Sequence, residues 1–145
     1  NANAMAQVLV AAREVAPIKT TEQLKLALRQ FLPKFKEHKI LAQIYQAIRI
    51  EVNQELEVIK EFLLQLPSVL HTGGRVSIIS YHSLEDRLVK RFIQTGKFEG
   101  EAEKDFYGNI DIPMKKVGGL VVPSKAEIAL NNRARSAKLR IAERV

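Results

Sequence analysis

Four consecutive polar residues, Ser80, Tyr81, His82 and Ser83, follow a short apolar run and are the first candidates for chemistry. We call these four residues the elbow. Histidine is the side chain that ordinarily titrates near neutral pH, so His82 could orient a polar group or accept a proton. The plainer alternatives are that His82 bonds to backbone, that Tyr81 packs in a core and that Ser83 caps a helix.

A second group lies near the end of the sequence and combines an amide with closely spaced cations. Its members are Asn132, Arg133, Arg135 and Lys138. Three cations within six residues suit contacts with phosphates, which position RNA without reading its sequence. Arg135 could instead pair with Asp86 or Glu85 if the two groups meet in space, and both interpretations stay open. Asp86 and Arg87 could also pair with each other and fix the elbow.

The composition of the 145 residues narrows the classes of function. The chain is 46% apolar and 27% charged, which is typical of a globular domain, and its formal net charge of +7 favours polyanionic partners or simply a well-solvated surface. No cysteine is present, which excludes disulfides and thiolate metal sites, and three scattered histidines lack ligand spacing. No segment is apolar enough to span a membrane and no signal peptide is visible, so we expect a cytoplasmic protein.

The elements that position the elbow are a strand and a helix. Gly73 and Gly74 predict a tight turn, and the β-branched run at residues 76–79 predicts a strand that is covered on both faces in a parallel sheet. Ser83 is the predicted N-cap of a helix that runs to Thr95 and stops at Gly96. In open α/β sheets ligands bind outside the carboxyl ends of strands, which is where the elbow lies.

Helical periodicity dominates the first half of the chain. It predicts a helix at 5–15, a second helix with a capping start at 20–23 and an apolar face over 24–32, a basic connector at 34–39, and one long helix at 40–66 that Pro67 kinks or splits. After a polar stretch at 96–112, a strand follows Pro113, and residues 123–127 have the form of an N-cap at Ser124 followed by a short helix that ends near 131–132. A final strand has Ala137, Leu139 and Ile141 on one apolar face. One central strand is too few for a complete α/β domain, so we interpret the chain as the back half of a doubly wound domain preceded by a helical segment.

Three separated strings resemble one family, the bacterial ribosomal RNA small-subunit methyltransferase H family, also called MraW. They are QAIRIEVNQEL at 46–56, SYHSLEDRLVKRF at 80–92 and PSKAEIALNNRARSAKLR at 123–140. The resemblance implies an α/β fold, the C-terminal part of a Rossmann-like class I methyltransferase sheet preceded by an all-helical insert. It assigns 1–39 to the insert, 40–72 to a long linking helix and 73–145 to the last strands and helices. The implied activity is methylation of the N4 amine of a cytidine in 16S rRNA.

The resemblance gives the two polar groups roles in that reaction. Methylation of an exocyclic amine requires a base that is flipped into a pocket and held in line with the methyl donor. We expect Ser80, Tyr81 and His82 to be catalytic, with Tyr81 able to stack on the base. The expected substrate-binding residues are Ser83, Arg87, Asn132, Arg133, Arg135 and Lys138, and the expected partner is 16S rRNA in the small ribosomal subunit.

The methyl donor implied by the family is S-adenosylmethionine, but the motifs that hold it are not found in this sequence. The glycine pair at 73 and 74 precedes a strand instead of following one, so it does not form a nucleotide-binding loop. We therefore expect the donor site before Asn1, an inactive chain in isolation, and an unpaired sheet edge that invites self-association. The alternatives are a free-standing nucleic-acid-binding module without catalysis and a scaffold that recruits a partner.

Overall fold

The computed structural model describes residues 1–102 and 104–145, which divide into two compact units, Asn1–Asn53 and Gln54–Val145. Residue 103, in the polar stretch predicted at 96–112, lies outside the described residues. No helix in the described part of the chain is long and apolar enough to cross a membrane.

The first unit is helical. Its elements are α1 (Ala2–Val15), α2 (Thr21–Ala27), the 3-10 helix η1 (Arg29–Phe31) and α3 (Glu37–Asn53). The predicted start of the second helix is confirmed, because Thr20 and Gln23 form a reciprocal capping box. That helix is shorter than predicted, since its last turn tightens into η1. Leu28 and Leu32 are buried at this turn.

The prediction of a single long helix at 40–66 is wrong, because the helix is interrupted at Gln54. This residue has a φ of 53°, in the left-handed region, and separates α3 from α4 (Glu55–Val69). The proline also behaves differently from its prediction: Pro67 lies inside the last turn of α4, which continues to Val69. A proline so close to the end of a helix removes only one hydrogen bond before the helix stops.

The second unit contains a three-stranded sheet. After α4 come β1 (Arg75–Ser80), α5 (Ser83–Thr95), β2 (Met114–Val121), α6 (Lys125–Leu130), the 3-10 helix η2 (Asn132–Ser136) and β3 (Lys138–Arg144). The strand order is β1-β3-β2, and β3 is antiparallel to both neighbours. The predicted parallel pairing of the first strand is therefore wrong. β1 and β2 do run in the same direction, joined through α5, but the last strand of the chain is inserted between them.

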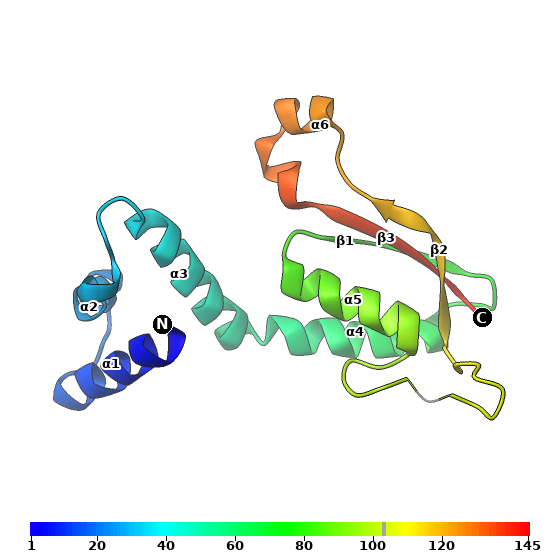
Figure 1. Cartoon of the computed structure of the whole chain (residues 1–145), viewed down its shortest axis with the longest axis horizontal. Coiled ribbons are helices and arrows are strands. Elements are labelled where there is room, and N and C mark those ends of the chain that lie inside the picture. The colour runs from blue at the N-terminus through cyan, green and yellow to red at the C-terminus, as the bar shows by residue number, and fades with distance from the viewer. Residues whose placement is uncertain (103) are drawn as a thin grey trace. The chain divides into compact units, whose positions relative to one another are not determined.

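Helices α4 and α5 lie side by side on one face of this sheet (Figure 1). They enclose the core of the unit, which consists of Leu63, Leu66, Val89, Phe92, Ile93, Met114 and Ala142. Val76 and Ile78 of β1 pack against it from the strand side, and Gly96 ends α5 with a φ of 68°, as predicted for a left-handed C-cap.

None of the described residues covers the other face of the sheet, which contradicts the prediction of a strand buried on both faces. Ile79 is 58% exposed, and β1 is an edge strand, since β3 is its one partner among the described residues. The final strand has the predicted alternation, but its apolar residues Leu139 and Ile141 share the uncovered face with Ile79 by register. Its cations Lys138 and Arg140 share the helix-covered face with Ser80 and Ile78.

Candidate functional site

The two polar groups meet at one end of the sheet. Ser80, the last residue of β1, is paired with Lys138, the first residue of β3. The elbow leaves the sheet at this point and the segment Asn132–Ser136 enters it at the same point. Because β1 and β2 run in the same direction, this end also holds both of their carboxyl ends, where α/β sheets bind ligands.

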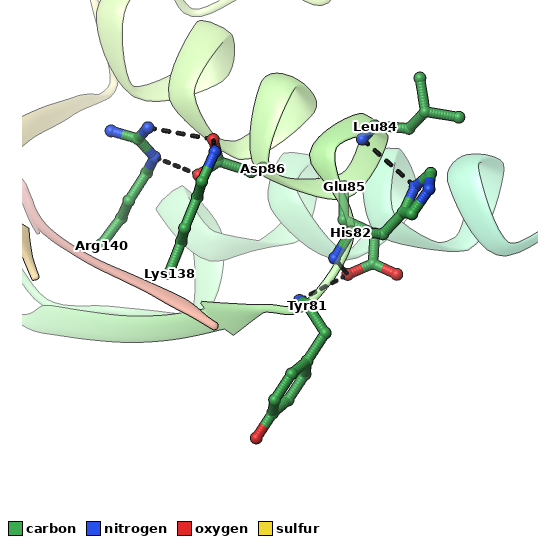
Figure 2. Close-up of polar contacts among 7 residues, drawn as sticks. All are labelled: Tyr81, His82, Leu84, Glu85, Asp86, Lys138 and Arg140. Atoms are coloured by element: carbon green, nitrogen blue, oxygen red, sulfur yellow. Dashed lines mark hydrogen bonds and ion pairs between the residues drawn. The ribbon is translucent and has the colours of Figure 1, made fainter. Parts of the chain in front are cut away.

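A network of backbone hydrogen bonds holds the elbow closed at the start of α5. The Glu85 carboxylate accepts from the backbone N–H groups of Tyr81 and His82 at 3.1 and 3.2 Å, and the Nδ1 atom of His82 accepts from the Leu84 N–H at 3.4 Å (Figure 2). His82 is therefore the N-cap of α5, and the prediction that Ser83 caps the helix is wrong. The sequence signal was a glutamate three residues after His82, which is the spacing of a capping box.

The three residues predicted to be catalytic do not converge on one point. Ser80 is buried, with 4% of its surface exposed. The ring of Tyr81 is 58% exposed and points away from α5, whereas the His82 ring lies beside the first turn of that helix (Figure 2). Of the three, Tyr81 and His82 are the side chains that a ligand at this end of the sheet could reach.

The capping bond of His82 also fixes what its ring can offer. An imidazole nitrogen that accepts a hydrogen bond carries no proton, so a neutral His82 ring has its proton on Nε2. In this state the free side of the ring is a hydrogen-bond donor.

A buried ion cluster ties the start of α5 to β3. The Asp86 carboxylate accepts from Arg140 Nε at 2.7 Å, from Arg140 Nη2 at 3.2 Å and from Lys138 Nζ at 3.1 Å (Figure 2). We call Asp86, Lys138 and Arg140 the Asp86 cluster. Burial raises the pKa of Asp86, but the hydrogen bonds from Arg140 and Lys138 outweigh it and leave the pKa below its ordinary value.

The Asp86 cluster corrects two sequence interpretations. Asp86 pairs with β3 and not with Arg87, and in the described part of the chain its cations are Lys138 and Arg140, not Arg135. Sequence reasoning missed Arg140 as a site residue. The available signal was two cations separated by one residue on a strand, which places both on the same face.

The cations that remain on the surface at this end come from η2 and α5. Arg133 and Arg135 are exposed, and the buried Ala134 between them anchors η2. Asn131, which sequence reasoning had not selected, holds this turn because its side chain accepts from the Arg133 N–H at 3.1 Å. Ser83, Arg87 and Asn132 are also exposed, and Lys138 keeps 38% of its side chain accessible.

The turn after β1 differs from a nucleotide-binding loop. A nucleotide-type donor needs a glycine-rich turn directly after a strand, so that backbone N–H groups can approach it. The turn after β1 contains no glycine, and its first N–H groups are already bonded to Glu85. Gly73, with a φ of 80°, lies in the turn before β1.

Comparison with known proteins assigns the chain to a family. A sequence model of the MraW methylase family matches residues 1–145. The chain belongs to that family.

Similar curated proteins carry the name ribosomal RNA small subunit methyltransferase H. The protein from Christiangramia forsetii is 65% identical over 145 residues, and the one from Flavobacterium johnsoniae is 62% identical over 145 residues; each alignment includes 100% of this chain and 48% of the relative. The protein from Flavobacterium psychrophilum is 62% identical over 144 residues, 99% of this chain and 50% of the relative. The chain spans about half the length of the curated relatives it matches.

Proposed function

We propose that these 145 residues form the substrate-side half of an S-adenosylmethionine-dependent methyltransferase that modifies the N4 amine of a cytidine in 16S rRNA. Residues 1–39 belong to a helical substrate-recognition insert, 40–72 link it to the catalytic domain, and 73–145 complete a Rossmann-like sheet. The donor site belongs to the other half of the longer protein. The chain alone is then inactive.

One observation carries this proposal: the pairing of Ser80 with Lys138, which brings the elbow and the cationic turn η2 to the same end of the sheet. An RNA substrate needs cations for its phosphates and a separate polar surface for the base that is modified. Arg133 and Arg135 supply exposed cations, and Tyr81 and His82 supply a ring and a hydrogen-bond donor nearby. The names of the half-matched relatives point to the same kind of substrate.

The orientation of His82 suggests its role. With Nδ1 occupied by the Leu84 N–H, the ring can donate from Nε2 to the carbonyl oxygen of a cytosine. His82 then orients the base and does not take its proton. Tyr81, which is exposed on the other side of the elbow, is placed to cover a face of the flipped base.

A substitution at His82 separates the capping role from the substrate role. Asparagine is a good N-cap but lacks the ring donor, so His82→Asn in the longer protein should change the free energy of unfolding by less than about 0.5 kcal/mol. Methyl transfer to small-subunit RNA should fall about tenfold or more, as for the loss of one orienting hydrogen bond. The measurement is transfer of a labelled methyl group from S-adenosylmethionine. Gln94→Ala, which changes an exposed polar residue near the far end of α5, is the control.

The free-standing nucleic-acid-binding module is the outcome that would replace this proposal. In that case the longer protein would bind RNA with the salt dependence expected of a basic surface but would transfer no methyl group to it. Full methyl transfer by the His82→Asn variant would leave the enzyme assignment intact and remove the role given to the ring.

A further inference from the structure

The uncovered face of the sheet is apolar at one end and charged at the other. Strand register places Ile79, Leu139 and Val121 in one row, and Ser77, Ile141 and Val117 in the next. We call Ile79, Val117, Val121, Leu139 and Ile141 the open face. The third row consists of Arg75, Glu143 and Lys115, in which Glu143 is paired with both cations at 2.8 and 2.9 Å.

The open face is accessible to solvent at the end that adjoins the elbow. Ile79 is 58% exposed and Val121 is 51% exposed, and a shallow groove of about 140 Å³ is lined by Ile79, Val121, Val122, Pro123, Glu127, Ala137 and Leu139. Three of these positions, 79, 121 and 139, form one row across all three strands. A contiguous apolar surface of this kind marks an interaction site.

The charge on this side of the sheet argues against RNA as its occupant. The cations on this side of β1 and β2 are Arg75 and Lys115, and Glu143 between them pairs with both, which leaves this row with a net charge of +1. The hydrogen bonds from Arg75 and Lys115 also hold the pKa of Glu143 below its ordinary value, so the carboxylate keeps its charge at neutral pH. A phosphate backbone would find five aliphatic side chains here and a single unbalanced positive charge.

The length of the relatives supports one occupant of the open face, which is the remainder of the longer polypeptide. They contain about as much chain again as these 145 residues. The outer edge of β1, which has no partner strand within 1–102 and 104–145, adjoins the same row as Ile79. An unpaired edge and an uncovered apolar face at one strand are what remains when a sheet is separated from the part that continues it.

We propose that the open face is the surface on which the other half of the longer polypeptide packs, and that Tyr81 lies at the margin of this contact. The inference rests on the proposed function, in which the chain is one half of an enzyme. It goes further because it names the surface that joins the halves and places the exposed ring of Tyr81 next to the junction, on the side away from α5 (Figure 2).

Single-cysteine labelling tests the proposal, because the chain contains no cysteine of its own. Ile79→Cys is made in the 145-residue chain and in the longer protein from the same reading frame, and maleimide labelling of its peptide is followed by mass spectrometry. Leu130→Cys, on α6 where Leu130 is 91% exposed, is the control. We expect Ile79→Cys to react at least about tenfold more slowly in the longer protein, as for a site reached only by local opening, and Leu130→Cys to react equally in both.

Hydrogen exchange of the unmodified proteins gives the same test without a substitution that could perturb folding. The amides of β1 should exchange more slowly in the longer protein than in the 145-residue chain. Equal labelling and equal exchange in the two lengths would overturn the proposal, and so would a reading frame that encodes only these 145 residues. Protection of the short chain that grows with its concentration would assign the face to a second copy. Protection that requires added RNA would assign it to substrate.

Methyl transfer by the same preparations separates this inference from the proposed function. Protection of Ile79→Cys in a longer protein that transfers no methyl group would overturn the function and keep the interface. Methyl transfer by a longer protein in which Ile79→Cys stays reactive would keep the proposed function and overturn the interface.

Discussion

Asp86 and Arg140 are 54 positions apart in the sequence and are joined by two hydrogen bonds, of 2.7 and 3.2 Å. The first lies in the opening turn of α5 and the second in the middle of β3. This pair, with Lys138 beside it, fixes the helix that begins at the elbow to the strand that leaves η2. The position of both polar groups at the candidate site therefore depends on the buried carboxylate of Asp86.

Replacing Asp86 by asparagine should destabilise the chain. Asp86→Asn keeps the shape of the side chain but leaves the partly buried Arg140 and Lys138 without an anion. Removing one partner of a partly buried, hydrogen-bonded ion pair should cost about 1–3 kcal/mol of unfolding free energy. The measurement is denaturant unfolding monitored by circular dichroism.

The matched control is the exposed pair between Glu57 and Lys60 on α4. Glu57→Gln should cost much less unfolding free energy than Asp86→Asn, because exposed ion pairs contribute little. Equal losses of unfolding free energy in the two variants would show that the Asp86 cluster stabilises the chain no more than an exposed ion pair does.

The Asp86 cluster should also make stability depend on pH on the acidic side. The pKa of Asp86 is below its ordinary value in the folded chain, so its contribution is fully present above the unfolded pKa, near 4, and is lost as the pH falls through the folded pKa. The difference in unfolding free energy between the wild type and Asp86→Asn should therefore shrink below about pH 4. A difference that stays constant from neutral pH to acid would contradict the ion pair as its cause.

Loss of the Glu85 carboxylate should open the elbow locally. Glu85→Ala leaves the backbone N–H groups of Tyr81 and His82 without the acceptor they share, at a cost of about 1–2 kcal/mol. Amide hydrogen exchange should speed up at these two positions and remain unchanged in β3. Glu85→Gln retains an acceptor oxygen and is the control. Exchange at Tyr81 and His82 that is the same in all three proteins would remove Glu85 as the element that closes the turn.

The cations of η2 should contribute electrostatically to RNA binding by the longer protein. Arg133→Ala and Arg135→Ala should each reduce the slope of log affinity against log salt by about 1, as for one lost phosphate contact. Both side chains are exposed, so the unfolding free energy should change little. Lys90→Ala, which removes an exposed cation from the middle of α5, should leave the slope unchanged. An unchanged slope in both arginine variants would separate η2 from the RNA-binding surface.

Local chemistry was the part of the fold that the sequence predicted well. The Thr20 capping box, the Ser124 cap of α6 and the Gly96 stop of α5 were readable because each depends on residues within one helical turn. The helix break at Gln54 carries no glycine or proline, so nothing in the local sequence announces it. The prediction for Pro67 was wrong because the destabilisation that a proline causes depends on its distance from the end of the helix.

Long-range pairing was the part that the sequence could not supply. The β-branched run in β1 predicts a strand but contains no information about its partner, and that partner, β3, begins 58 residues after Ser80 in the chain. The insertion of β3 between β1 and β2 makes the sheet antiparallel and turns Lys138 and Arg140 toward Asp86. The elbow and the cationic segment could be identified from the sequence. The side chains that hold them together, Asp86, Lys138 and Arg140, could be identified only from the register of β3 against β1.

Titration of S-adenosylmethionine into the 145-residue chain and into the longer protein, followed by calorimetry, tests most directly the claim that this chain is the substrate-side half of a methyltransferase. We expect saturable heat from the longer protein and none from the 145 residues, because the turn after β1 is closed by Glu85 and contains no glycine. Saturable binding of the donor by the 145-residue chain alone would contradict the account.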